Sequence, residues 1–277
     1  MEPEEAHAAG GIRERPLAIP SAGFPLCGFL HRPARARGAV LIVPPIFDER
    51  NGAQRTLVDL ARALARAGFA ALRFDPRGVG DSPGGLEGVT LAAWRADVRA
   101  ALAALRAETG SSPTALVGLR FGAALAFSET ASLDVPAAVL LEPVLEGHSY
   151  LRSLLQLRAL RRGLTAGGSA ATLMEEVLRE DPFDLDGFAV PAALAREIAA
   201  LDLRQNSPAF FPGKLLLVQI SGAQALNAAN TGWTQRLAAS GAKIETAVLR
   251  LPPFWSQVER VDTGELVRLA TEWIAQP

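Results

Sequence analysis

The chain has 277 residues, of which 49% are hydrophobic and 21% charged, so it can bury a large core and is neither disordered nor collagen-like. Its 28 Lys and Arg nearly balance its 29 Asp and Glu, for a formal net charge of -1, so nucleic acid is not an expected partner. The single cysteine, Cys27, can form neither an internal disulfide nor a metal cluster, which favours a reducing compartment.

The N-terminal residues give no sign of export. Residues 1–5 are acidic and lack the positive and apolar regions of a secretion signal. No apolar run reaches the roughly 18–20 residues of a membrane span. We therefore expect a cytoplasmic protein without a transmembrane segment, and we expect neither a metal nor a cofactor.

Strand and helix patterns alternate along most of the chain. Residues 1–14 read as a polar leader, and strands at 17–19 and 24–31 bracket a turn at 20–23. A continuous apolar run at 39–43 is typical of a strand buried on both faces, and leucines at 57, 60 and 64 predict the helix after it. Further strands are predicted at 69–74, 114–117, 137–141, 214–220 and 243–248, and further helices at 94–105, from 121, at 227–239 and at 264–275. This alternation predicts an α/β fold with a mostly parallel sheet and helices on both faces.

The alternation stops between about residues 142 and 212. That segment reads as short helices at 150–164, 170–179 and 192–201, which we interpret as an inserted helical cap over 144–212, with the core at 1–143 and 213–277. In its first helix leucine and arginine share the same stripe. We therefore expect a cap helix buried on more than one side rather than a membrane-surface helix.

A strand-to-helix turn stands at Gly118-Leu119-Arg120-Phe121-Gly122. Two glycines four residues apart at this junction are the setting of a nucleophile elbow, where strand and helix approach closely and the central residue is strained. The central residue here is Arg120.

The chain resembles an α/β-hydrolase at this turn, and residues 73–82 (RFDPRGVGDS) resemble a loop common in that superfamily. We regard the polar residues of this loop as structural turn chemistry. A closer resemblance, from about residue 23 to the C-terminus, is to the second type of hydrolase-like protein associated with exosortase A systems. It is carried by residues 44–51 (PPIFDERN), 118–120 (GLR), 142–144 (EPV) with Gly147, and 252–255 (PPFW). This resemblance implies an α/β-hydrolase fold and a setting of exopolysaccharide production and protein sorting at the cell envelope.

The groups of a serine hydrolase are missing at three expected places. A guanidinium with a pKa above about 12 offers no lone-pair nucleophile, so Arg120 cannot replace a serine. Residues 220–226 (ISGAQAL), where the acid normally stands, contain no carboxylate. The histidines are His7, His31 and His148, so none follows the last strand, where Trp255 stands instead.

Arg120 admits two roles. Projecting from the first turn of a helix, it could hold a carboxylate or phosphate group of a ligand. Alternatively, it pairs internally with Glu142 at the end of the neighbouring strand, which we favour because buried arginines are rarely left unpaired. The two roles can coexist if the pair opens for a ligand.

Other candidate ligand-binding residues surround Arg120 in the expected fold. Pro45, Ile46, Glu49 and Asn51 follow the strand at 39–43, where hydrolases place an oxyanion donor, although Glu49 and Asn51 could equally cap the next helix. Phe121 and Trp255 would line the pocket, with core packing as the alternative for Trp255. His148 could overhang the pocket or be a surface residue.

Two classes of function follow from these residues. In the first, the protein is a non-catalytic relative that binds a small acyl, lipid-linked or anionic ligand, or a partner protein, beneath the cap. In the second, it is an unconventional hydrolase or acyltransferase acting on esters or thioesters through Glu142, His148 or an activated water. We favour the first class, because the nucleophile, acid and histidine of the hydrolase mechanism are all missing. The fold alone is weak evidence for a reaction.

Overall fold

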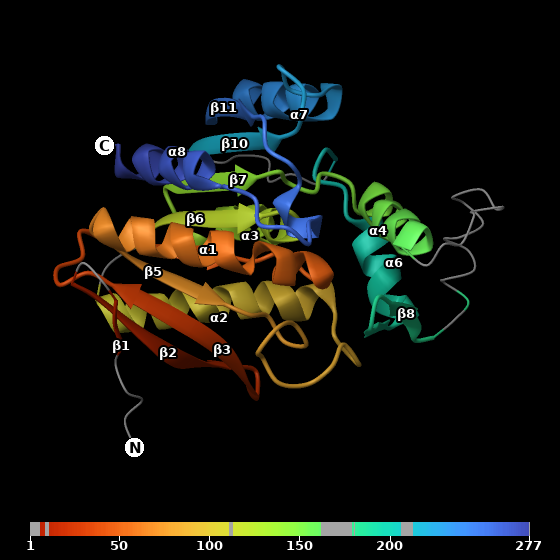
Figure 1. The fold of residues 1–277 in the computed structure, drawn as a ribbon, viewed down its shortest axis with the longest axis horizontal. Coiled ribbons are helices and arrows are strands. Elements are labelled where there is room, and N and C mark those ends of the chain that lie inside the picture. The colour runs from red at the N-terminus through yellow and green to blue at the C-terminus, as the bar shows by residue number, and fades with distance from the viewer. Residues whose placement is uncertain are drawn as a thin grey trace.

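The computed structural model describes residues 6–8, 11–110, 113–161, 179, 181–205 and 213–276. Over these residues the main sheet has nine strands: β1 (Ala6–Ala8), β2 (Ile12–Ser21), β3 (Phe24–Arg32), β4 (Gly38–Val43), β5 (Phe69–Phe74), β6 (Pro113–Leu119), β7 (Ala137–Leu141), β10 (Lys214–Ile220) and β11 (Lys243–Leu249). Their order is β1-β2-β3-β5-β4-β6-β7-β10-β11, and all pairs from β5 to β11 are parallel (Figure 1). The carboxyl ends of six strands therefore meet at one edge of the sheet.

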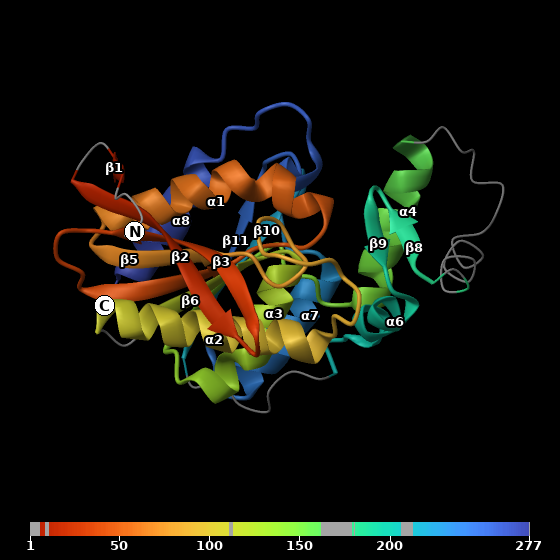
Figure 2. The ribbon, with the colours of Figure 1, turned by 90° about the horizontal axis from the view of Figure 1, so that it is seen from below.

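Helices cover both faces of the sheet, as Figure 2 shows. The helices of the core are α1 (Asp48–Arg66), α2 (Leu91–Thr109), α3 (Phe121–Leu133), α7 (Ala228–Ala239) and α8 (Gly264–Ala275), with a 3-10 turn η1 (Phe254–Ser256). One apolar cluster joins the sheet to α1, α8 and η1, and the other joins it to α2, α3 and α7. The central strands β4, β5, β7 and β10 are buried along almost their whole length, which explains their continuous apolar runs.

The predicted alternation is confirmed. The strands predicted at 69–74, 137–141 and 214–220 and the helix at 264–275 have these bounds in the structure. The prediction of a polar leader over 1–14 is wrong for its described part. β1 pairs with β2, which begins at Ile12, and that side chain is buried in the sheet.

Between β7 and β10 lie the elements of the expected cap. They are α4 (Gly147–Arg161), a hairpin of β8 (Phe183–Leu185) and β9 (Phe188–Val190), and α6 (Ala192–Ala200), all at one end of the sheet (Figure 2). The hairpin was not expected, and the helix predicted at 170–179 falls almost wholly outside the described residues. The domain boundaries at 144 and 212 stay a prediction.

The first cap helix is buried on one side only, which contradicts the expectation. Its buried residues follow a single stripe at Gly147, Tyr150, Leu151, Leu155 and Ala159. Leu160 is 76% exposed. Helical spacing thus separates a core-facing side from an outer side, despite the mixed leucines and arginines. No helix among the described residues is long and apolar enough to span a membrane.

The loop after β5 has the structural role expected of it. Asp75 accepts hydrogen bonds from Arg50 Nε at 3.0 Å and Arg50 Nη2 at 2.5 Å, and Arg50 Nη2 also donates to Asp81 at 3.0 Å. The Ser82 hydroxyl donates to the carbonyl of Asp75 and accepts from the amide of Cys27. These contacts fasten the loop to α1 and β3.

Candidate functional site

The turn between β6 and α3 has the close packing expected of an elbow. A Cβ atom on Gly118 would lie 2.4 Å from Ala123 Cα, and one on Gly122 would lie 2.1 Å from the carbonyl oxygen of Pro44. Only glycine fits at either place. Arg120 between them has φ 55° and ψ -122°, a backbone conformation that L side chains rarely adopt.

Two more strained residues lie at the same edge of the sheet. Phe47, just before α1, has φ 56°, and Glu142, directly after β7, has φ 43°. Each such conformation costs about 1–3 kcal/mol, and such residues cluster at functional sites. The strain therefore marks the loops after β4, β6 and β7 as one candidate site.

The ion-pair partner of Arg120 is Glu49, and the expected pair with Glu142 is wrong. Arg120 Nε and Nη2 both donate to Glu49 Oε1 at 3.0 Å. Glu49 lies in the first turn of α1, which begins at Asp48, and its side chain reaches across to the elbow. The Glu142 carboxylate is engaged elsewhere, since its Oε2 accepts the amide hydrogen of Ile220 at 2.5 Å.

The charges of this site are shaped by burial. Burial alone would lower the pKa of Arg120, but Glu49, with smaller contributions from Tyr150 and Glu142, more than offsets this effect. The pKa of Arg120 therefore lies above its ordinary value, and the guanidinium stays charged. Burial raises the pKa of Glu142, and the Ile220 amide and Arg120 oppose that shift only in part. Glu142 is therefore easier to protonate than an ordinary carboxylate.

Aromatic rings enclose the ion pair. The Tyr150 hydroxyl donates to Glu49 Oε2 at 3.1 Å, and its ring centroid lies 5.5 Å from Arg120 Cζ. The ring of Trp255 lies 4.8 Å from the same atom, and Phe121 stacks on Tyr150 with centroids 5.5 Å apart. Burial raises the pKa of Tyr150 well above its ordinary value, so the phenol stays a donor. Arg120 and Glu49 therefore have hydrogen-bonding or aromatic partners from α1, α4 and η1.

The remaining expected site residues lie in different places. Pro45 and Ile46 are buried beside the elbow. His148 is exposed on α4, which agrees with its surface alternative. Neither Glu49 nor Asn51 caps the following helix, because both lie inside α1 and its N-terminus has no side-chain cap.

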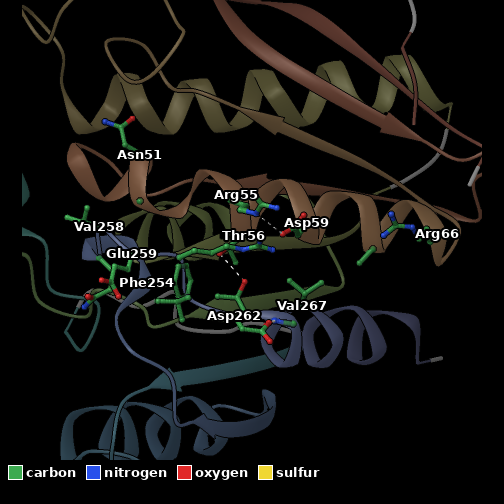
Figure 3. Close-up of a pocket in the computed structure, with 17 residues that line it drawn as sticks. Asn51, Arg55, Thr56, Asp59, Arg66, Phe254, Val258, Glu259, Asp262 and Val267 are labelled. Carbon is green, nitrogen blue, oxygen red and sulfur yellow. Dashed lines mark hydrogen bonds and ion pairs between the residues drawn. The ribbon is translucent and has the colours of Figure 1, made fainter. Parts of the chain in front are cut away.

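Asn51 does not line the cleft above Arg120. It lines a separate open cavity of about 510 Å³ between α1 and the segment from η1 to α8 (Figure 3). The hydrogen bond between Thr56 and Thr263, at 3.1 Å, closes the base of that cavity. Asn51 is therefore not part of the site around Arg120.

Tyr150 is the functional residue that the sequence did not single out. It is the only tyrosine of the chain, and it belongs to the cap rather than to the sheet edge. Its contact with Glu49 spans 101 positions in sequence, so no local pattern could predict it.

Little free space remains above the ion pair. The cleft there has a volume of about 30 Å³, which is room for a single water molecule. Its walls come from α1, the cap and η1, and are Phe47, Asp48, Glu49, Leu154, Leu157, Arg161, Leu185, Asp186, Trp255 and Ser256. A ligand larger than a water molecule can enter this cleft only if its side chains move.

The arrangement offers charge recognition rather than a nucleophile. Arg120 supplies donors and positive charge, Trp255 occupies the place of the base, and Ser221 and Gln219 hydrogen-bond to each other near the place of the acid. Among the described residues no group of three or more His, Cys, Asp or Glu side chains is placed to hold a metal ion.

A family model described as serine aminopeptidase, S33, matches residues 34–180, which is more than half of the chain. The protein belongs to the serine aminopeptidase S33 family. The α/β-hydrolase fold expected from the turn motifs is thereby confirmed for this S33 protein. No curated protein sequence matches the chain.

Solved structures share the fold of this S33 protein at low sequence identity. Est1E from Butyrivibrio proteoclasticus, with ferulic acid bound, has a TM-score of 0.62 at 16% identity, with 94% of this chain and 96% of that chain covered. A carboxyl esterase from Bacillus coagulans has a TM-score of 0.63 at 14% identity, with 94% and 97% covered. Proline iminopeptidase from Mycobacterium smegmatis has a TM-score of 0.61 at 12% identity, with 94% and 97% covered. At these identities the likeness concerns the fold.

Proposed function

We propose that this S33-family protein is a non-catalytic relative of esterases and peptidases that binds a ligand or partner at its former active site. The observation that carries the proposal is Arg120 at the nucleophile position, held in an ion pair with Glu49. A guanidinium has neither the nucleophilic lone pair nor the removable proton that acyl transfer needs. A shared fold alone is weak evidence that this protein catalyses the reactions of its relatives.

The chemistry of the pocket favours an acyl or anionic ligand. The Glu49 carboxylate lies against Arg120 at the N-terminus of α3, where a ligand carboxylate or phosphate would be stabilised in the same way. An incoming anion must therefore displace Glu49 and open the cleft beneath the cap. A partner protein that inserts an acidic side chain would satisfy the same geometry.

Anion binding can be tested by loosening the internal pair. Replacing Glu49→Gln removes the competing charge, so a small carboxylate such as acetate should bind more tightly than to the wild type, by isothermal titration. Glu272→Gln is the control, because it removes an exposed carboxylate that is paired with Arg268 on α8. Unchanged affinity in Glu49→Gln would contradict competition for Arg120.

A second candidate is an unconventional hydrolase or acyltransferase acting on esters or thioesters. The observation that favours it is Glu142, whose raised pKa and position beside Arg120 suit a group that exchanges protons with an activated water. His148, the other base considered, is exposed on α4.

The two candidates are separated by a panel of small esters and thioesters. Wild type, Arg120→Ala and Glu142→Gln are purified in parallel, so that a contaminating esterase gives equal rates in all three. We expect equal background rates and no covalent adduct with a serine-directed phosphonate. Turnover that disappears in either variant would refute the non-catalytic proposal.

We further propose that the protein serves an exosortase system as an accessory of exopolysaccharide production or protein sorting. This rests on the motif resemblance at residues 44–51, 118–120, 142–144 and 252–255. Deletion of the gene in its host should reduce exopolysaccharide or mis-sort envelope proteins. Unchanged polysaccharide and sorting would refute the association.

A further inference from the structure

Another cavity lies between α1 and the β3–β5 side of the sheet. Its volume is about 240 Å³, and it shares no lining residue with the cleft above Arg120. The lining comprises Cys27, Gly28, Phe29, Ile42, Pro44, Arg50, Gln54, Leu57, Arg73, Phe74, Asp75 and Asp81. This space is below the roughly 300–1,000 Å³ of drug-sized sites, so it suits a compact ligand.

Arg73 lies in this cavity without a carboxylate partner. Its Nε donates to His31 Nε2 at 3.1 Å, and its guanidinium lies 5.6 Å from the ring of Phe29. Over the described chain, no carboxylate comes within 4.0 Å of Arg73, and its two terminal nitrogens make no hydrogen bond. The guanidinium is half-buried, and its terminal nitrogens are not among the fully buried polar atoms, so they are open to a ligand in the cavity.

The neighbouring carboxylates are already committed to other cations. Asp75 is paired with Arg50 through both oxygens, and Asp81 with the same arginine through Oδ2. On the other side, Glu14 accepts two hydrogen bonds from Arg62 and one contact from His31 Nδ1.

Among the described residues, no carboxylate therefore forms an ion pair with Arg73. Burial lowers its pKa from the ordinary value, and nearby Asp75 offsets this only in part. The guanidinium remains a cation at any physiological pH. An acceptor from outside the chain would relieve both its desolvation and its unused donors.

We propose that this cavity binds a compact oxyanion, a small carboxylate or a phosphate group, on the terminal nitrogens of Arg73. Planar guanidinium groups bind carboxylate and phosphate through two parallel hydrogen bonds. The amide of Gln54 lines the same space and can donate a third. The site is independent of the proposed role of Arg120.

Cys27 provides a built-in reporter of occupancy. It is the only cysteine of the chain and lines the cavity, so the rate at which an uncharged maleimide labels the native protein reports access to the site. Burial raises the pKa of this thiol, so it is labelled more slowly than an ordinary exposed thiol. Mass spectrometry follows the labelling.

The experiment compares labelling rates with and without inorganic phosphate and, separately, succinate, at ionic strength matched with sodium chloride. At ten times the dissociation constant we expect about tenfold slower labelling of the wild type, because the free fraction falls by that factor. Arg73→Gln should label at one rate with or without the anion. Arg55→Gln, which removes an exposed arginine of α1 outside this cavity, should be protected like the wild type.

The outcomes decide the proposal and its ligand class. If only phosphate slows the labelling of Cys27, the ligand class is phosphate groups. If only succinate slows it, the ligand class is carboxylates. If Arg73→Gln loses its native circular dichroism, Arg73→Met, which keeps the unbranched stem beside Phe29, replaces it. Equal protection in the Arg73 variant and the wild type, or a wild-type rate unchanged by both anions, would overturn the proposal.

Discussion

Removing the carboxylate of Glu49 should destabilise the protein by about 3 kcal/mol, at the lower end of the range for breaking a buried ion pair. Glu49→Leu deletes two hydrogen bonds from Arg120 and one from Tyr150. The Glu49 and Arg120 side chains are only 6% and 16% exposed, so water replaces these bonds poorly. The cost lies at the lower end because Trp255 and Tyr150 still face the guanidinium.

A double-mutant cycle measures the coupling free energy between Glu49 and Arg120 directly. Arg120→Met alone should cost about as much, since it leaves the Glu49 carboxylate with Tyr150 as its remaining partner. The double variant should cost little more than either single one, because it leaves neither charge unpaired, so we expect a coupling of about 2–3 kcal/mol.

Urea unfolding followed by circular dichroism measures each corner of the cycle. The control is the pair of Arg268 and Glu272, 2.8 Å apart on α8 and 61% and 59% exposed, where we expect a coupling of only about 0.3–0.5 kcal/mol. A coupling for the buried pair no larger than this control would refute the assignment of Glu49 as the partner of Arg120.

Three further predictions concern other contacts. Tyr150→Phe should cost about 2 kcal/mol in urea unfolding, because Glu49 loses a buried donor; no measurable loss would mean that the bond contributes nothing. Burial and the neighbouring Arg73 lower the pKa of His31 to about 4. Between about pH 6.5 and 4 the unfolded chain therefore binds a proton at His31 that the folded protein does not, so the free energy of unfolding should fall as the pH drops through this range. An equally steep decline in a His31→Gln variant would contradict this. Gly122→Ala should destabilise the protein by about 3 kcal/mol or more, because the new Cβ would lie 2.1 Å from the carbonyl oxygen of Pro44. Gly232→Ala on α7, where no atom lies nearer than 3.6 Å, should instead stabilise it by about 0.5–1 kcal/mol. The opposite order of the two variants in thermal unfolding would be evidence against this packing.

The fold could be predicted from sequence where burial is complete. The strands at 69–74, 137–141 and 214–220 are flanked by turn residues and have almost no polar side chains, so their bounds follow from composition. The pair of N-terminal strands was also predicted, and β3 lies within one residue of its predicted bounds, but β2 begins at Ile12 rather than at residue 17. Its early part was missed because a strand with one exposed face alternates polar and apolar residues.

The site could be predicted in position but not in pairing. Arg120 is locatable because glycine spacing at a strand-to-helix junction is a local signal. Glu49 and Glu142 follow the strands on either side of β6, so both are adjacent candidates by topology. Which of the two carboxylates pairs with Arg120 depends on tertiary contacts. Glu142 is hydrogen-bonded to the amide of Ile220, 78 positions away in the sequence. Glu49 lies in the first turn of α1, from which its side chain reaches Arg120.

The strained backbone at Arg120 has a consequence for protein engineering. Its φ of 55° persists around a side chain that performs no nucleophilic attack, so the strain is maintained by the packing of β6 against α3 rather than by a reaction. The turn would therefore present whichever residue is installed at this position in the same orientation. A cysteine or serine placed there would gain the geometry of a nucleophile at once, and Trp255 would then be the first position at which to supply a base.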